Sequence, residues 1–139
     1  MNWLSWALLS ALFAGITAVL AKVGVAEINS HVATAIRTSV VLVFTWVIAL
    51  VSVKAGDWPT ITPRAWLFLA FSGVATGLSW LCYFRALQLG EVSKVAPLDK
   101  LSVVIAIVLS IAFLGERLAA RECAGAALLV AGALVLAWK

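Results

Sequence analysis

Five long apolar stretches divide this sequence, and each is about as long as a membrane is thick. They cover residues 2–21, 32–53, 65–89, 95–114 and 119–138. A helix needs about 20 mostly apolar residues, within a range of about 17–25, to cross the hydrocarbon layer of a bilayer. The short alternating segments of a membrane β-barrel do not occur. The sequence therefore predicts an all-α integral membrane protein, a single domain over residues 1–139 with five transmembrane helices.

The composition supports a lipid environment. Hydrophobic residues make up 65% of the chain and charged residues 12%, whereas a soluble domain is about 45–50% apolar and about 25% charged. The net charge of +4 is spread along the chain without a basic run. We therefore expect the lipid bilayer as a partner and no nucleic acid. Cys82 and Cys123 lack the spacing of metal ligands, and no metal or cofactor is predicted.

An odd number of spans places the two termini on opposite sides of the membrane. The basic residues would then divide as follows: Lys54, Arg64, Arg117 and Arg121 on one side, and Lys22, Arg37, Lys94, Lys100 and Lys139 on the other, with Arg85 near this second group. Because the numbers are similar and several of the second group fall near or inside helices, the bias that normally orients membrane proteins is weak. The chain is therefore expected to be able to insert in either orientation.

Each of the first four predicted helices carries one polar stripe at helical spacing. The stripes contain hydroxyls, small residues and a few charges: Ser10 and Thr17; Thr34, Arg37, Thr38 and Thr45; Ser72, Thr76, Ser79 and Tyr83; and Asp99, Ser102 and Ser110. One interpretation is that the hydroxyls bind carbonyls of their own helices and the small residues permit close packing. The other, which we favour, is that four stripes line a shared water-filled cavity.

The residues predicted to bind substrate in that cavity are Thr17, Arg37, Thr38, Ser79, Trp80, Tyr83, Asp99, Lys100 and Ser102. Arg37 is the sharpest case, because a charge in the hydrocarbon layer costs about 2.5–3.5 kcal/mol. It is expected to reach the membrane surface, to pair with Glu27 or Asp99, or to face the cavity as a functional cation.

Pro97 and two glycines mark special backbone positions. Proline lacks an N–H donor and disfavours helix in the residue before it, so Pro97 predicts either a helix break near the membrane boundary or an ordinary helix start. Free amides at a helix N-terminus attract anionic groups. Gly125 and Gly132, one heptad apart, allow another helix to approach closely. That helix could be the fourth predicted helix or a second copy of the chain.

The order of several motifs resembles an EamA-type domain of the drug/metabolite transporter superfamily, over essentially the whole chain. The motifs are residues 83–87 through Gly90, residues 95–98, Phe113-Leu114-Gly115-Glu116-Arg117-Leu118, and the alanine-rich run 125–136. Most members resemble two such units fused in inverted orientation. The resemblance thus implies an antiparallel homodimer of ten helices in a prokaryotic inner membrane, transporting and commonly exporting small metabolites.

One departure from related proteins narrows the substrate. The small multidrug resistance proteins use a glutamate in the first helix to exchange protons for cationic drugs, and residues 1–21 contain no Asp or Glu. The interior charges suit an anionic or zwitterionic metabolite, such as an amino acid, better than a lipophilic cation. The alternatives are a non-transporting subunit that stabilises a partner and a flippase for lipid-linked substrates. The sequence shows no nucleophile–base pair of the kind that an enzyme would use, and His31 stands alone near a span end.

Overall fold

The computed structural model describes residues 2–53 and 61–138, which form helices without strands. The elements are α1 (Trp3–Gly24), α2 (Ser30–Ser52), α3 (Pro63–Leu89), α4 (Val92–Asp99), α5 (Leu101–Leu109), the π-helix η1 (Ser110–Leu114) and α6 (Ala120–Ala137). With Val92–Leu114 taken as one span, the described residues contain five helices long and apolar enough to cross a membrane. This confirms the predicted helical membrane fold. Residues 54–60 of the predicted loop lie outside the described residues.

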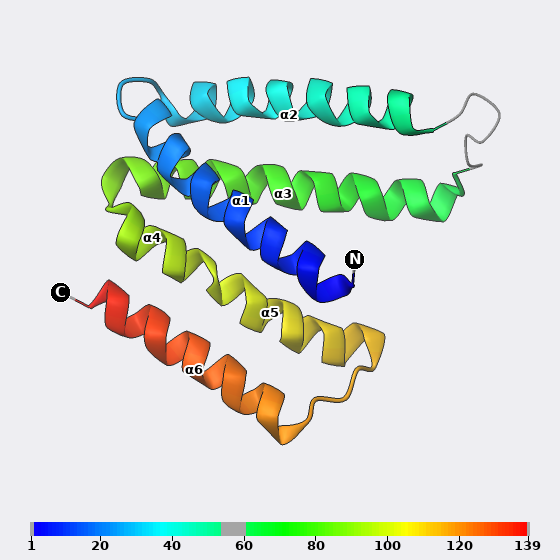
Figure 1. The fold of residues 1–139 in the computed structure, drawn as a ribbon, viewed down its shortest axis with the longest axis vertical. Helices are drawn as coiled ribbons and strands as arrows, with labels where there is room; N and C mark the ends of the chain where they lie inside the picture. The colour runs from blue at the N-terminus through cyan, green and yellow to red at the C-terminus, as the bar shows by residue number, and fades with distance from the viewer. Residues whose placement is uncertain (1, 54–60, 139) are drawn as a thin grey trace. The chain divides into compact units, whose positions relative to one another are not determined.

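The described chain groups into two compact units. One unit comprises residues 21–88 and holds α2, α3 and the last turn of α1. The other unit comprises residues up to 20 together with those from 89 onward, and it holds the rest of α1 with α4, α5, η1 and α6. We call them the α2–α3 unit and the α4–α6 unit. Within the first, α2 and α3 lie side by side and run in opposite directions (Figure 1). Each unit is described by itself below.

The end of α3 is bonded to the turn between α1 and α2. Lys22 Nζ donates to the Leu87 carbonyl, and Gln88 Nε2 donates to the carbonyls of Val25 (3.1 Å) and Ile28 (2.7 Å). The last carbonyls of a helix have no partner within the helix, and a cation near them also interacts favourably with the helix dipole. Val25 and Leu87 are fully buried. Polar and apolar contacts together therefore hold this corner of the α2–α3 unit.

The fourth predicted helix begins earlier than residue 95, at Val92. The Glu91 carbonyl accepts hydrogen bonds from the amides of Lys94 (3.1 Å) and Val95 (3.0 Å), and the Lys94 ammonium pairs with the Glu91 carboxylate at 3.2 Å. Lys94, which the sequence reading assigned to the loop, thus fits into the first turn because its charge has a partner one turn back.

The discontinuity in this span lies at Lys100, three residues after Pro97. Pro97 is inside α4, and Lys100 both ends α4 and precedes α5. The Lys100 amide donates to the Pro97 carbonyl at 3.1 Å, and the Lys100 carbonyl accepts from the Val103 amide at 3.0 Å. Such bonds between residues three apart tighten the helix locally, as in a 3₁₀ turn. The proline is accommodated by the helix, and the irregular geometry appears after it.

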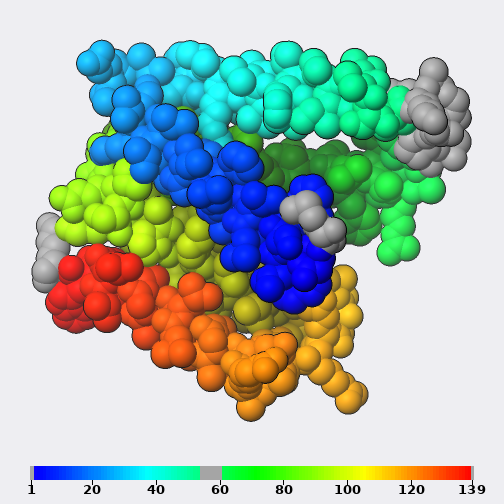
Figure 2. Space-filling view, viewed as in Figure 1, coloured from blue at the N-terminus to red at the C-terminus, as the bar shows by residue number. Residues whose placement is uncertain are grey.

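α6 packs along α4 and α5 within the α4–α6 unit (Figure 2). Ala133 is buried in this contact at 4% exposure. η1 ends at Gly115, whose φ of +67° lies in the left-handed region that glycine adopts without steric cost. At Gly125 and Gly132 no neighbouring helix of the described chain approaches closely, because a Cβ atom added at either position would meet nothing within 4 Å.

Candidate functional site

Arg37 lies on α2 and stacks against aromatic rings of α3. Its guanidinium carbon is 4.1 Å from the centroid of the Trp80 ring and 5.6 Å from that of Phe84. Trp80 and Phe84 are four residues apart, so they share one face of α3. Tyr83, next to Phe84 on α3, also lies near Arg37. We call Arg37, Trp80, Tyr83 and Phe84 the Arg37 site.

The aromatic rings stabilise the charge of Arg37 without cancelling it. The face of an aromatic ring carries partial negative charge, and a cation above it gains about 0.5–2 kcal/mol. Phe84 is buried, whereas Arg37 and Trp80 are half-buried. In the described part of the α2–α3 unit, the sole carboxylate is Glu27, and no ion pair joins it to Arg37. Pairing with Glu27, one of the alternatives for Arg37, is therefore not found, and no described carboxylate of this unit compensates the charge of Arg37.

This geometry leaves Arg37 able to bind an oxyanion. A guanidinium has five N–H donors in one plane, and the described contacts of the Arg37 guanidinium within its unit are with rings and not hydrogen bonds to oxygen acceptors. Carboxylate and phosphate groups match this fork with two parallel, charge-assisted hydrogen bonds. The Arg37 site can thus hold a negatively charged group of a small molecule while the rings fix the orientation of the guanidinium.

A groove of about 390 Å³ lies elsewhere between α2 and α3. Its lining residues are His31, Thr34, Ala35, Thr38, Ser39 and Leu42 from α2 and Gly77 and Leu81 from α3. Arg37 is not among them, so the stripe predicted on α2 divides: Thr34 and Thr38 line the groove, and Arg37 meets the aromatic rings. A Cβ atom added at Gly77 would meet nothing within 4 Å. A side chain at position 77 would therefore find open space.

Most of the stripe hydroxyls with hydrogen bonds donate to their own helices. Thr34, Thr38, Thr45 and Thr76 each donate to the carbonyl four residues earlier at 2.8 Å. These bonds satisfy the hydroxyl donors without any water, as the first interpretation of the stripes requires. The hydroxyl stripes alone therefore do not indicate a water-filled cavity, and Arg37 becomes the stronger functional signal.

The α4–α6 unit has its own groove, of about 460 Å³. It is lined by Pro97 and Lys100 together with Gly125, Leu128, Leu129, Gly132, Ala133 and Leu136 of α6. Cβ atoms added at Gly125 or Gly132 would meet nothing within 4 Å. The two glycines thus lie beside the contact of α6 with α4 and border open space. Lys100 Nζ is 3.7 Å from the Asp99 carboxylate, so this cation has a partner within its own span.

The predicted site residues fall in both units. Arg37, Thr38, Ser79, Trp80 and Tyr83 belong to the α2–α3 unit, and Thr17, Pro97, Asp99, Lys100 and Ser102 belong to the α4–α6 unit. The structure brings Arg37 together with Trp80 and Tyr83, and it brings Pro97 and Lys100 to one groove. The shared cavity remains a prediction.

Two residues of this region were not predicted from the sequence. Phe84 joins the Arg37 site, and its spacing of one helical turn from Trp80 could have indicated this. Gln88 binds two carbonyls of the α1–α2 turn, and nothing in its local sequence points to that role. Over residues 2–53 and 61–138, no group of three or more His, Cys, Asp or Glu side chains could hold a metal ion.

Comparison with known proteins agrees with the helical membrane fold. The model of the EamA-like transporter family matches residues 1–138. A protein of Sinorhizobium sp. named "Uncharacterized transporter in cobO 3'region" is 56% identical, in an alignment that covers 98% of this chain and 96% of that protein. No solved structure matches the chain.

Proposed function

We propose that this chain, which belongs to the EamA-like transporter family, exports small polar metabolites across the prokaryotic inner membrane by alternating access. The proposed substrates carry a negatively charged group, as amino acids and related anionic or zwitterionic compounds do. The family and the relative named as a transporter support transport as the activity. Substrate class, direction and mechanism are our proposal.

The observation that carries this proposal is the position of Arg37. It lies within a helix that can span a membrane, 4.1 Å from Trp80, and no ion pair joins it to a described carboxylate of its unit. Charged residues inside membrane spans are costly and mark ligand pathways in many membrane proteins. Because the rings leave the guanidinium donors available, an anionic group of a substrate is a suitable partner for it.

We further propose that two copies assemble in opposite orientations. Large apolar side chains on the outer faces of the single chain are exposed, including Val51 (81%) and Phe113 (82%), and these need lipid or protein to cover them. Two inverted copies would supply the ten helices with the two-fold pseudosymmetry common among secondary transporters. The groove beside Gly125 and Gly132 provides one surface where a second copy could pack.

Counterflow into proteoliposomes tests the proposed transport. The purified chain would be reconstituted in liposomes loaded with an unlabelled mixture of the protein amino acids, and uptake of the radiolabelled mixture would be followed. We expect uptake above that of protein-free liposomes and a loss of about tenfold or more in Arg37→Ala, the size expected when a charge-assisted hydrogen-bond pair to the substrate is removed. Arg64→Ala is the matched control. Equal uptake by wild type and Arg37→Ala, with both folded, would show that Arg37 does not bind substrate.

Labelling of the C-terminus tests the antiparallel dimer. A single cysteine added after Lys139, in a background lacking Cys82 and Cys123, would be exposed to a membrane-impermeant thiol reagent before and after cells are permeabilised. We expect about half of the molecules to react from outside, because the charge bias is weak. Reaction from one side alone would contradict a dimer of inverted copies.

The hydrogen bonds that threonine hydroxyls make within their own helices are also compatible with a second function, that of a non-transporting subunit that stabilises a partner membrane protein. The threonines of α2 and α3 are satisfied by their own helices, so their faces could pack against partner helices without water. In that case single cysteines at Ser72, Thr76 and Ser79 would be protected from hydrophilic thiol reagents. Reaction at these positions, with transport by the purified chain, favours the transporter.

A further inference from the structure

We infer that the protein is an exchanger: it crosses between its two open states far faster with a carboxylate-bearing solute bound than when empty. Arg37 is the residue that imposes this coupling. The inference rests on the proposed transport function and deepens it, since it specifies both the group that binds and the transport mode. It follows from the charge of the Arg37 site in three steps.

The first step is that, within the described α2–α3 unit, the Arg37 site holds a positive charge with which no carboxylate forms an ion pair. Arginine is not deprotonated in proteins. In the described α2–α3 unit the interactions of the Arg37 guanidinium are with the rings of Trp80 and Phe84 and with Tyr83. Rings and a neutral phenol stabilise a cation but leave its formal charge in place. Glu27, the described carboxylate of this unit, forms no ion pair with Arg37.

The second step concerns closure of the site. A transporter that works by alternating access passes through a state closed to both sides, in which water is withdrawn from the binding site. The rings of Trp80 and Phe84 lie 4.1 Å and 5.6 Å from the guanidinium carbon, and a ring does not replace the oxygen atoms of water as an acceptor for the N–H donors. A buried charge without a partner is strongly disfavoured. Closure of the empty site is therefore slow.

The third step is the effect of substrate. A carboxylate accepts two parallel hydrogen bonds from a guanidinium and neutralises its single charge. A solute bearing one carboxylate therefore satisfies the donors of Arg37. It also removes the electrostatic penalty for closing the site around an unpaired charge. A dianion would leave one negative charge in excess, and a cation would add a positive one. Small monocarboxylates without a second charge fit the site best; a zwitterionic amino acid satisfies the donors of Arg37 through the same carboxylate, and its ammonium then needs a partner of its own.

Efflux from proteoliposomes tests this inference. Vesicles loaded with a radiolabelled mixture of the protein amino acids would be diluted into plain buffer, which reports net efflux, or into buffer with the unlabelled mixture, which reports exchange. We expect exchange to be at least about tenfold faster, because the empty site has to close around an unpaired charge. External N-acetyl amino acids, which keep the carboxylate, should accelerate efflux, whereas the corresponding amino alcohols, which lack it, should not.

Three variants separate the role of the charge from that of the fold. Arg37→Gln keeps hydrogen-bond donors but removes the charge, so its net efflux should approach its exchange rate. Arg37→Lys keeps the charge and should keep the preference for exchange. Arg64→Gln should behave as wild type, because Arg64 is exposed in the first turn of α3 with its guanidinium 5.9 Å from the Phe68 ring.

The outcomes distinguish this inference from the proposed function. Net efflux equal to exchange in the wild type, with both above protein-free liposomes, overturns the exchange mode and leaves transport standing. Acceleration by amino alcohols as strong as by N-acetyl amino acids overturns the carboxylate as the recognised group. Flux no greater than that of protein-free liposomes overturns both. A preference for exchange that survives in Arg37→Gln shows that the charge of Arg37 is not its cause.

Discussion

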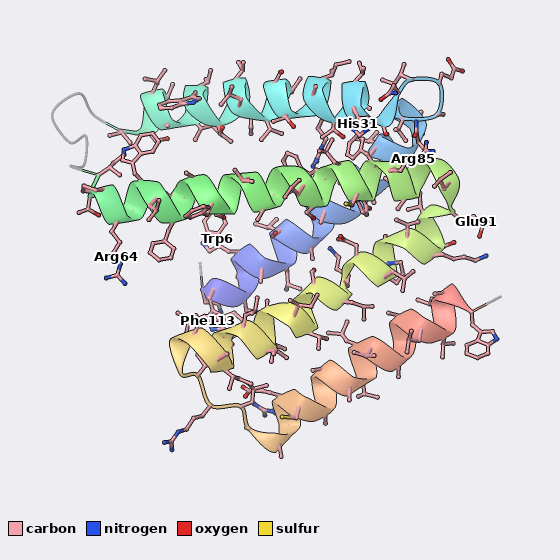
Figure 3. All side chains as sticks on the ribbon, turned by 180° about the vertical axis from the view of Figure 1, so that it is seen from behind. Trp6, His31, Arg64, Arg85, Glu91 and Phe113 are labelled. Atoms are coloured by element: carbon pink, nitrogen blue, oxygen red, sulfur yellow. The ribbon has the colours of Figure 1, made fainter. Side chains whose placement is uncertain are left out.

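Arg37 and Arg64 both place a guanidinium near an aromatic ring of α3, yet their positions differ. Arg64 is exposed in the first turn of α3, 5.9 Å from the ring of Phe68 on the same helix. Figure 3 shows it projecting from the helix end. Arg37 is half-buried on another helix, 4.1 Å from Trp80 and 5.6 Å from Phe84. A cation at a span end reaches polar surroundings through its long side chain, whereas one inside the span depends on what the protein or a ligand provides.

The comparison shows that a cation–π contact alone does not define a site. Position in the span decides how much solvation the charge has lost and therefore how much it gains from an anion. Lys22 and Lys100 are stabilised by oxygen atoms: Lys22 donates to the Leu87 carbonyl, and Lys100 lies 3.7 Å from the Asp99 carboxylate. Arg37 differs from both because its described contacts include the rings of Trp80 and Phe84 and no carboxylate or carbonyl of its unit.

The largest effect should come from removing the ring beneath Arg37. Trp80→Ala takes away the closest aromatic face, worth about 0.5–2 kcal/mol, and frees the guanidinium to adopt other orientations. We expect the apparent affinity for amino acids in counterflow to fall about tenfold, since 1.4 kcal/mol corresponds to that factor. The matched variant Phe68→Ala should change it less than about twofold. If the two variants lose affinity equally, the contrast between the two arginines has no functional meaning.

A smaller effect should follow from removing the cation at the end of α3. Lys22→Met keeps most of the apolar stem but leaves the Leu87 carbonyl without its ammonium donor. We expect the free energy of unfolding in detergent to fall by about 1–3 kcal/mol, the usual effect of orphaning a buried acceptor. Arg85→Met, which removes an exposed cation bonded to Gln88 at 3.0 Å, should lower it by less than about 1 kcal/mol. Equal stability of wild type and Lys22→Met would show that this contact does not hold the corner.

The smallest effect concerns the groove between α2 and α3. Leucine at Gly77 would project into open space beside Thr38 and Leu81, so the fold should tolerate it within about 1 kcal/mol. If the groove changes shape during transport, Gly77→Leu should slow counterflow while leaving the apparent affinity at Arg37 intact. Gly73→Leu is the control, because Gly73 also has open space around its Cβ position but lies outside the groove. Equal rates for the two variants would remove the groove from the mechanism.

The sequence predicted the helices well because each span is long and bounded by charges or turn residues. It also identified Arg37, since a charge inside an apolar stretch is visible without a structure. Phe84 and Gln88 were missed because their roles depend on how α3 is rotated against α2 and the α1–α2 turn, and local spacing does not encode that rotation. The sequence predicts that the helix begins after Lys94, because a charged residue usually ends an apolar span, whereas the ion pair with Glu91 lets the helix begin at Val92.

The hydroxyl stripes were the weakest part of the prediction. A threonine on a helix can face a cavity or bond to its own backbone, and the sequence pattern is the same in both cases. The described threonines of α2 and α3 do the second. The sequence likewise predicts the irregular turn at Pro97, because a proline is recognisable in a sequence. The change of hydrogen-bond register that follows it at Lys100 is not recognisable there.

Fluorescence of Trp80 offers the most direct measurement of substrate binding at Arg37. The other tryptophans, at positions 3, 6, 46, 58, 66 and 138, would be replaced by phenylalanine so that emission comes from the ring 4.1 Å from the guanidinium. Titration of this variant with the amino-acid mixture, prepared without tryptophan and tyrosine so that the ligand does not emit, should shift the emission saturably, and adding Arg37→Ala should abolish the shift. No shift in a variant that still transports, or the same shift without Arg37, would contradict the placement of the substrate at this site.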